Sequence, residues 1–195
     1  MKIITISGAS GSGKSTLANY IHNSTPDSLL LGIDRYYLSK KEQIAKNGFI
    51  NFDYPTALDV ELMKENIKLL QRDGEATVPL YDFTVSKRSG YETVTAKNHI
   101  IIDGLFAGTL LQDTSNLDIF VDVDLDLALL RRIERDMNER GRTLDSVKKQ
   151  YMTDVRPAYF KHIKQIKETA DIVLTNNHST DQLLSEAKGI LHLIA

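Results

Sequence analysis

The 195-residue sequence contains no cysteine, which excludes disulfides, thiolate metal sites and cysteine nucleophiles. No apolar run approaches the roughly 20 residues that a membrane-spanning helix needs. The first ten residues lead directly into a glycine-rich motif and do not resemble a signal peptide. The formal net charge of -2 gives no global basic field of the kind that nucleic-acid binding requires. We therefore expect a cytoplasmic protein that binds neither membranes nor nucleic acids.

The residues that are present follow the pattern of an α/β protein. Apolar runs of strand length alternate with longer amphipathic stretches, which is typical of a parallel sheet covered by helices. The length fits a single domain spanning residues 1–195. The expected strands are residues 3–7, 28–33, 99–103, 117–123 and 172–174. The expected helices are residues 14–22, 58–72, 125–140, 144–156 and 181–194.

Two segments interrupt this alternation. Residues 78–83 and 91–95 both have strand character and are separated by a polar stretch, so we predict a β-hairpin over about residues 76–96. We expect this hairpin to project over the substrate site. Residues 35–56 resemble an irregular excursion with scattered aromatic side chains. Long loops inside compact domains are usually functional or disordered, and the aromatic content favours function.

Residues 8–15, GASGSGKS, match the phosphate-binding pattern GxxxxGK[ST] in full. The glycines permit backbone angles that turn N–H groups inward as a nest for phosphate oxygens. The following helix adds the positive end of its dipole. Lys14 can reach the β- and γ-phosphates, and the Ser15 hydroxyl can ligate Mg²⁺. An apolar strand precedes the motif and an amphipathic helix follows it, as a P-loop requires.

Two features favour a phosphotransferase over an ATPase or a switch GTPase. The apolar strand 100–103 ends in Asp103 and Gly104, so it lacks the Asp-Glu pair with which many P-loop ATPases orient water. The asparagine-lysine-x-aspartate guanine signature is also absent. Asp103 can serve a metal ion through water, whereas Gly104 has no side chain with which to activate anything.

A run of arginines in residues 131–142 predicts a catalytic lid over about residues 131–156. Phosphoryl transfer needs cations around the moving phosphoryl group and the exclusion of water. The alternative is a solvated helix whose arginines pair with Glu134, Asp136 and Glu139. The arginines of this lid are Arg131, Arg132, Arg135, Arg140 and Arg142.

The predicted fold class is thus a P-loop NTPase of the nucleoside/nucleotide kinase type, with a parallel sheet flanked by helices, a projecting β-hairpin and an Arg-rich lid.

Asp34 follows the second apolar run, and open α/β sheets place their ligands at the carboxyl ends of parallel strands. A carboxylate there can accept the proton of an acceptor hydroxyl, or hold that hydroxyl in line with the γ-phosphate. The alternative is a helix or turn cap, a common role of aspartate.

Together these residues resemble the uridine kinase (uridine–cytidine kinase) family of P-loop kinases over nearly the whole chain. Beyond the P-loop, the most specific blocks are NFDYP, VPLYDF and ERGR. The matching blocks run in order through residues 8–16, 34–37, 51–55, 78–83, 103–104, 120–122, 131–132, 139–142 and 150–151.

The resemblance implies a donor and metal site at the P-loop. Asp34 would be the general base and a metal-site residue, and Ser15 and Asp103 would complete the Mg²⁺ environment. The family usually has Glu at the position of Asp103. Arg135 and Arg140 would face the ATP phosphates. The phosphate cradle would consist of Gly8, Ala9, Ser10, Gly11, Ser12, Gly13, Lys14, Ser15 and Thr16.

The resemblance also implies an acceptor site. Asp53 would hold the ribose hydroxyls, and Tyr81 and Phe83 would lie near the base, although alternate packing on a hairpin is another explanation for these two rings. Ser86 stands where the family commonly has a histidine that hydrogen-bonds the pyrimidine. The alternative for Ser86 is an exposed hairpin residue. The residues around the nucleoside would be Arg132, Arg142 and Gln150.

The sequence therefore predicts transfer of phosphate from ATP, with GTP as another donor, to the 5'-hydroxyl of a nucleoside such as uridine or cytidine, with Mg²⁺. Such a reaction belongs to pyrimidine salvage. Lys14, Asp34, Arg140 and Arg142 are the expected catalytic residues. The alternatives are a related kinase for pantothenate, a sugar phosphate or nicotinamide riboside, and a non-catalytic nucleotide-binding regulator. The preferred base, donor stringency, feedback regulation and oligomeric state, including a homo-oligomer, stay open.

Overall fold

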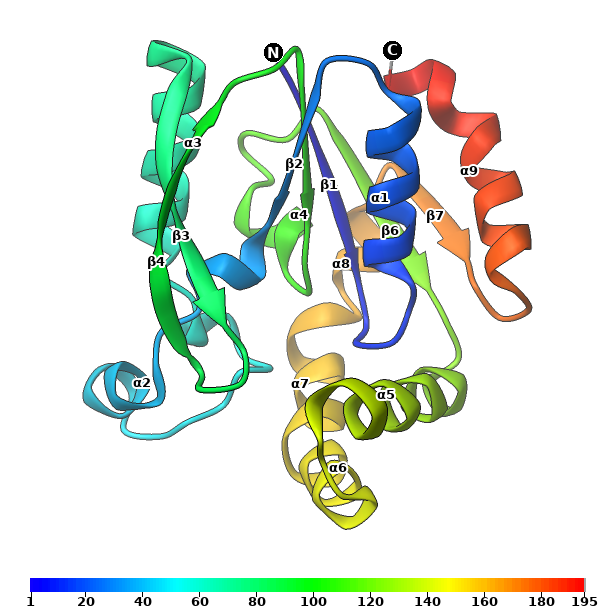
Figure 1. Cartoon of the computed structure of the whole chain (residues 1–195). Coiled ribbons are helices and arrows are strands. Elements are labelled where there is room, and N and C mark those ends of the chain that lie inside the picture. The colour runs from blue at the N-terminus through cyan, green and yellow to red at the C-terminus, as the bar shows by residue number, and fades with distance from the viewer. Residues whose placement is uncertain (195) are drawn as a thin grey trace.

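Five parallel strands form the centre of the computed structural model, which describes residues 1–194 (Figure 1). The strand order is β2-β5-β1-β6-β7, so the first strand lies in the middle of the sheet. The five predicted strands and the α/β fold class are confirmed. The bounds are β1 Lys2–Gly8, β2 Ser28–Gly32, β5 His99–Asp103, β6 Leu117–Asp122 and β7 Ile172–Thr175.

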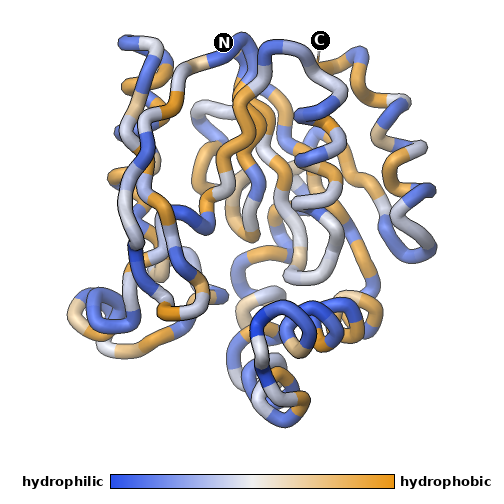
Figure 2. The backbone as a smooth tube through the Cα atoms, in the orientation of Figure 1, coloured by the Kyte–Doolittle hydropathy of each residue, from blue (hydrophilic) through white to orange (hydrophobic). Residues whose placement is uncertain are grey.

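Helices bury both faces of this sheet, because successive side chains of a strand point to opposite faces. Ile4 and Ile6 pack with residues of α1 (Lys14–Ser24) and α9 (Thr180–Ile194). Ile3 belongs to a second cluster that includes residues of α3 (Val60–Asp73), α4 (Ala107–Leu110) and α8 (Ile166–Thr169). Figure 2 shows the hydrophobic colouring concentrated on the central strands. Within residues 1–194, no helix combines the length and the apolar character that crossing a membrane requires.

The predicted hairpin is confirmed as a separate two-stranded antiparallel sheet beside α3 (Figure 1). Its strands are β3 (Glu75–Asp82) and β4 (Lys87–Thr95), with a register shift between Leu80 and Tyr81. An ion pair from Arg88 Nη2 to Asp59 Oδ2, 2.7 Å long, joins the hairpin to the residue that caps α3. The hairpin is therefore fixed on α3 through a charged contact as well as through apolar packing.

The expectation of an irregular segment over residues 35–56 is wrong in part. After the 3₁₀ turn η1 (Ile33–Tyr36), the chain forms α2 (Lys40–Asn47) and then a second 3₁₀ turn, η2 (Pro55–Ala57). A capping box starts α2, because Glu42 N donates to Ser39 Oγ at 3.3 Å and Ser39 N donates to Glu42 Oε2 at 2.7 Å. Gly48 ends the helix in the left-handed conformation. The Ser-x-x-Glu spacing is a local signal that could have identified this helix.

The helix predicted for residues 144–156 continues past its expected end. After α5 (Leu125–Arg140), whose predicted bounds are confirmed, α6 (Leu144–Gln150) runs into the π-helical turn η3 (Tyr151–Val155). Then follow α7 (Arg156–Ala158) and a second π-helical turn, η4 (Tyr159–Ile163). Pro157 suggests a stop because it lacks an N–H group. The flanking turns bond i to i+5 instead, as from Arg156 N to Tyr151 O, so the chain passes the proline without ending the helix.

Gln43 is a fully buried polar side chain that joins the two ends of the segment around α2. Its Nε2 donates to Leu38 O at 3.1 Å, and its Oε1 accepts from Asn51 N at 3.0 Å. We expect Gln43→Ala to lower the free energy of unfolding by about 1–3 kcal/mol, because two backbone groups lose their partners. Urea denaturation followed by circular dichroism measures this change.

The matched control is Gln182→Ala on the exposed surface of α9. Among residues 1–194 its side chain bonds only Glu186, at 3.1 Å, so the stability should stay within about 0.5 kcal/mol of wild type. Equal effects of the two substitutions would contradict the role of Gln43.

Candidate active site

The glycine-rich loop of residues 8–15 lies between β1 and α1, as the sequence predicts. Gly11 and Gly13 have φ of 88° and 92°, and a Cβ atom on them would lie 2.4 Å from Ala128 O and 2.5 Å from Asn176 Nδ2. Glycine is therefore required both by the backbone angle and by close approach. Asn176 Nδ2 also donates to Ser12 O at 2.7 Å. The loop is thus held between α5 and the segment after β7.

Lys14, Asp34 and Asp103 form a charged group beside this loop. Burial lowers the pKa of Lys14, against the opposing effect of the two carboxylates. Burial raises the pKa of Asp34, against the opposing effect of the Lys14 ammonium. One oxygen of Asp34, Oδ1, is buried without a hydrogen-bond partner. Asp34 lies in η1, directly after β2, so the carboxylate predicted at the end of this strand does face the P-loop lysine.

Ser15 and Asp103 lie together at the start of α1, where Ser15 Oγ donates to Asp103 Oδ2 at 2.7 Å. With the unpartnered Oδ1 of Asp34, they provide a hydroxyl and two carboxylates, all of them oxygen donors. Mg²⁺ prefers oxygen ligands and usually binds through one or two carboxylates together with substrate phosphates. The residues predicted for a metal site therefore fit Mg²⁺ in their donor chemistry. Thr16 follows on the exposed first turn of α1.

Four of the five arginines of the predicted lid converge on the fully buried Asp136, which sequence analysis named only as a pairing alternative. Arg135 Nη2 lies 2.7 Å from this carboxylate, Arg142 Nη1 3.4 Å, Arg140 Nη1 3.5 Å and Arg132 Nε 3.6 Å. Four guanidinium groups around one carboxylate leave an excess of positive charge at this end of α5. Such an excess attracts anions, which favours a catalytic lid over a solvated helix.

The lid also reaches the P-loop and the hairpin. Arg135 Nη2 donates to Ser10 Oγ at 3.4 Å, and the Arg140 guanidinium lies 5.5 Å from the centre of the Phe83 ring. Arg131 lies apart from the group and donates to Asn176 O at 3.0 Å. Arg131 thus supports the loop after β7, whereas Arg135 contacts the P-loop and Arg140 contacts the hairpin.

The residues predicted for the nucleoside also come together. Asp53 is 5% exposed, with Oδ1 3.6 Å from Arg132 Nη1 and Oδ2 buried without a partner. Burial raises the pKa of Asp53, and the charge of Arg132 opposes this shift. Arg132 Nη2 donates to Gln150 Oε1 at 3.1 Å, and Arg142 Nη1 donates to the same oxygen. Asp53 Oδ2 is therefore an acceptor without a partner, and the guanidinium groups of Arg132 and Arg142 are donors held in place by Gln150. Recognition of a molecule that carries hydroxyl groups requires both kinds of group.

Tyr81 and Phe83 belong to a larger aromatic group than the sequence predicted. Their ring centres lie 5.2 Å apart, and Tyr37 lies 5.8 Å from Tyr81 and 5.4 Å from Phe52. Burial raises the pKa of Tyr37, and the charges of Asp34 and Asp53 raise it further. Tyr37 thus lies close to both carboxylates. Tyr37 was not among the predicted site residues. Its position three residues after Asp34 could have indicated that it lies near the site, whereas its contact with Tyr81 depends on the fold.

Ser86 lies in the hairpin turn with a φ of 54°, in the left-handed region. The Oδ1 atom of Asp82 closes this turn by accepting from Thr84 N at 2.7 Å. Ser86 is half-buried in this turn, and its contact with the base stays a prediction. Histidine is among the residues that adopt left-handed angles more often than most.

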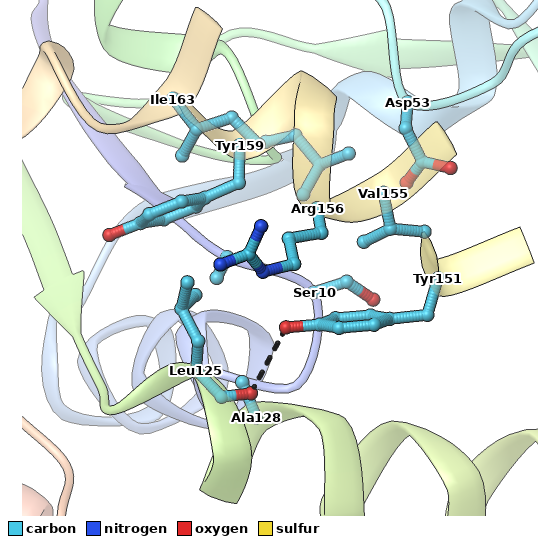
Figure 3. A pocket seen from close by; sticks show the side chains of 11 residues that line it. Ser10, Asp53, Leu125, Ala128, Tyr151, Val155, Arg156, Tyr159 and Ile163 are labelled. Atoms are coloured by element: carbon cyan, nitrogen blue, oxygen red, sulfur yellow. Dashed lines mark hydrogen bonds between the residues drawn. The ribbon is translucent and has the colours of Figure 1, made fainter. Parts of the chain in front are cut away.

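A small cavity of about 10 Å³ lies between the P-loop, α5 and the π-helical segment, with room for roughly one water molecule (Figure 3). Tyr151 Oη donates across it to Leu125 O at 3.4 Å. Tyr159 and Ile163 line the same wall, and both lie beyond Arg156, where the predicted helix ends. The other lining residues are Ala9, Ser10, Asp53, Leu105, Ala128, Val155 and Arg156.

The parallel sheet, the P-loop and the arginine cluster define a P-loop kinase. The sequence profile of the Phosphoribulokinase / Uridine kinase family matches residues 3–182, and the chain belongs to this family. It is 37% identical to a uridine kinase of Borrelia turicatae, over 100% of this chain and 96% of the relative. It is 36% identical to a uridine kinase of Lactiplantibacillus plantarum, over 97% of this chain and 95% of the relative.

Solved structures share the fold at lower identity. A phosphoribulokinase from Rhodobacter spheroides has a TM-score of 0.65 at 17% identity, covering 89% of this chain and 69% of that one. A D-glycerate 3-kinase from Cryptococcus neoformans has a TM-score of 0.69 at 15% identity, covering 89% of this chain and 86% of that one. Their names give different acceptors on one fold, so the fold by itself does not identify the acceptor.

Lys14→Ala should weaken the binding of a non-hydrolysable ATP analogue about tenfold or more. The reason is that a charge-assisted hydrogen bond contributes about 1.5–3 kcal/mol. Isothermal titration calorimetry measures the affinity, and circular dichroism should show the fold retained. Lys64→Ala, on the exposed face of α3, is the control and should bind as wild type does. Wild-type affinity of Lys14→Ala would disprove the assignment of the loop to phosphate.

Proposed function

We propose that this protein transfers the γ-phosphoryl group of ATP to the 5'-hydroxyl of a nucleoside, releasing ADP and a nucleoside 5'-monophosphate. The observation that carries the proposal is a pair of carboxylates, the half-buried Asp34 and the buried Asp53, each with one buried oxygen that lacks a partner. Asp34 lies beside the P-loop lysine Lys14, and Asp53 lies beside Arg132. A molecule with a reactive hydroxyl at one end and further hydroxyls at the other matches this arrangement, as a ribose does.

The donor phosphates would lie in the P-loop, where backbone N–H groups and the helix dipole favour negative charge. Lys14 would hold the β- and γ-phosphates, with Arg135 and Arg140 on the opposite side. Arg142 and Arg140 would stabilise the charge that develops on the transferred group. The closeness of Arg135 to Ser10, 3.4 Å, supports this placement because it brings the lid to the loop.

Asp34 would accept the proton of the attacking hydroxyl. In the reaction, a bond forms between the 5'-oxygen and the γ-phosphorus, and the bond from that phosphorus to the bridging oxygen of ADP breaks. The raised pKa of the half-buried Asp34 brings its basicity closer to that required for accepting a proton near neutral pH. Mg²⁺, held by Ser15, Asp34 and Asp103, would neutralise phosphate charge. Asp103 is shorter than the usual glutamate, yet its contact with Ser15 supports the same role.

The nucleoside would lie between the hairpin and the lid. Asp53 would accept hydrogen bonds from the ribose hydroxyls, while Arg132, Arg142 and Gln150 would enclose the sugar. The aromatic rings of Tyr81 and Phe83 would pack against the base. A cytoplasmic location, a role in pyrimidine salvage, GTP as a second donor and a homo-oligomeric state stay predictions from the sequence.

Incubating the pure protein with ATP, Mg²⁺ and a panel of acceptors tests the proposal. The panel includes uridine, cytidine, a purine nucleoside, pantothenate and nicotinamide riboside. We expect ADP release only with a nucleoside and the appearance of its 5'-monophosphate. Release without any acceptor would indicate an ATPase, and no release would indicate a nucleotide-binding regulator; either result would refute the proposal.

Asp34→Asn keeps the shape of the side chain and removes its basicity. We expect kcat to fall by about 10² to 10⁴, the usual contribution of a general base, with the affinity for ATP little changed. Asp73→Asn is the control, because Asp73 pairs with Arg72 on the surface, and it should leave kcat unchanged. An unchanged kcat in Asp34→Asn would show that Asp34 is not the general base.

Ser86 should make the wild-type protein a weak discriminator between uridine and cytidine, which differ chiefly at position 4 of the base. A buried polar group left unpaired is costly, so a site that reads this position rejects the wrong base strongly. Ser86→His should raise kcat/KM for uridine relative to wild type, and the turn should tolerate it because histidine accepts left-handed angles.

Val85→His places the same ring on the neighbouring exposed position and should leave the selectivity unchanged. Steady-state kinetics on uridine, cytidine and a purine nucleoside compare the three proteins. Strong wild-type selectivity for uridine that Ser86→His does not alter would show that the base is recognised elsewhere.

A further inference from the structure

Asp136 is the one side chain of α5 that contacts four arginines at once, among the residues the structure describes. It is fully buried, whereas Glu134 and Glu139 on the same helix are exposed and form no ion pair with these arginines. Burial would raise the pKa of Asp136, yet the hydrogen bonds and charge of Arg135, with those of its other partners, hold that pKa below its usual value. The carboxylate is therefore ionised at neutral pH and neutralised by its partners.

The two oxygens of Asp136 hold different pairs of arginines. Oδ1 accepts from Arg135 Nε at 3.0 Å and Nη2 at 2.7 Å, and it lies 3.5 Å from Arg140 Nη1. Oδ2 lies 3.6 Å from Arg132 Nε and 3.4 Å from Arg142 Nη1. In the proposed function the first pair binds the ATP phosphates and the second pair encloses the nucleoside, with Arg142 also beside the transferred phosphoryl group. One rigid carboxylate thus fixes the distance between the groups that would bind donor and acceptor.

The backbone of Asp136 fixes the same region. Its carbonyl oxygen accepts from the N–H group of Gly141 and from that of Arg142 at 3.1 Å. These bonds close the end of α5 and set the direction in which the chain leaves the helix. Arg140 and Arg142 lie on either side of this turn, so the residue that holds their side chains also holds their backbone.

We propose that Asp136 is a positioning residue that couples the donor site to the acceptor site, an inference that rests on the proposed nucleoside kinase function. It touches neither substrate. It holds the phosphate-facing and the nucleoside-facing arginines in one geometry, so that a change at Asp136 disturbs both sites together. Misplacement of reacting groups by about 1 Å can cost about 10²-fold in rate, so the expected effect is large.

The experiment compares Asp136→Asn with single changes of its partners. Asp136→Asn should raise KM for ATP and KM for uridine about tenfold or more each, because every arginine loses a charged partner, and should lower kcat about 10²-fold. Arg135→Ala should act mainly on KM for ATP, and Arg132→Ala mainly on KM for uridine. Glu134→Gln, which neutralises an exposed carboxylate of the same helix, should leave all three constants unchanged.

Thermal unfolding of each variant separates positioning from stability, with kinetics measured well below the lowest melting temperature. A lower melting temperature of Asp136→Asn with wild-type constants would overturn the proposal, and so would an effect on only one substrate. If Asp136→Asn does not fold, Asp136→Glu keeps the charge, and its longer side chain should still raise both KM values. Wild-type kinetics of Asp136→Glu, or its failure to fold, would make Asp136 a purely structural residue and overturn the proposal.

Binding of a non-hydrolysable ATP analogue distinguishes this inference from the proposed function. If the wild type phosphorylates no nucleoside, the proposed function fails. Calorimetry of wild type, Asp136→Asn and Glu134→Gln then still measures whether Asp136 positions the phosphate-facing arginines. Equal affinities in all three proteins would overturn the role of Asp136 by themselves.

Discussion

Both faces of the parallel sheet are buried by helices, and this constraint determines where polar chemistry can lie in the molecule. The buried strands are mostly apolar, because a polar side chain inside the sheet needs a partner, as Ser7 Oγ has in the N–H group of Gly108. The strands end together at one edge, where β1 leads into the P-loop and η1 follows β2 with Asp34. The hairpin and α5 reach the same edge from outside the sheet (Figure 1). The candidate site is thus assembled where the sheet stops.

The charges at this edge stabilise one another before any substrate arrives. Asp136 neutralises part of the arginine cluster, and Lys14 partly offsets the cost of burying Asp34. Two carboxylate oxygens of the site, Asp34 Oδ1 and Asp53 Oδ2, are buried without a hydrogen-bond partner. Buried acceptors without partners are costly in a folded protein, so they indicate positions where a bound molecule supplies the missing donors.

Periodicity and short motifs predicted most of the fold. The alternation of apolar runs and amphipathic stretches located all five strands of the sheet, and the bounds of α5 agree with its helical pattern. Two elements were missed for local reasons. The Ser39–Glu42 capping box begins α2 inside a segment whose scattered aromatic residues favoured an irregular loop. The helix predicted for residues 144–156 continues past Pro157, because the wider π-helical turns on either side accommodate the missing N–H group.

The sequence by itself determined the phosphate loop, the helix that carries the arginines and the class of enzyme, because these depend on residues that are neighbours in the chain. Family membership follows from motifs of the same local kind. Only the tertiary structure decided that Asp136, and neither Glu134 nor Glu139, lies among the arginines. It also decided that Tyr37 meets Tyr81 across the site. Such contacts depend on the path of the chain between distant residues and on which face of a helix is buried, and these are set by packing of the whole molecule.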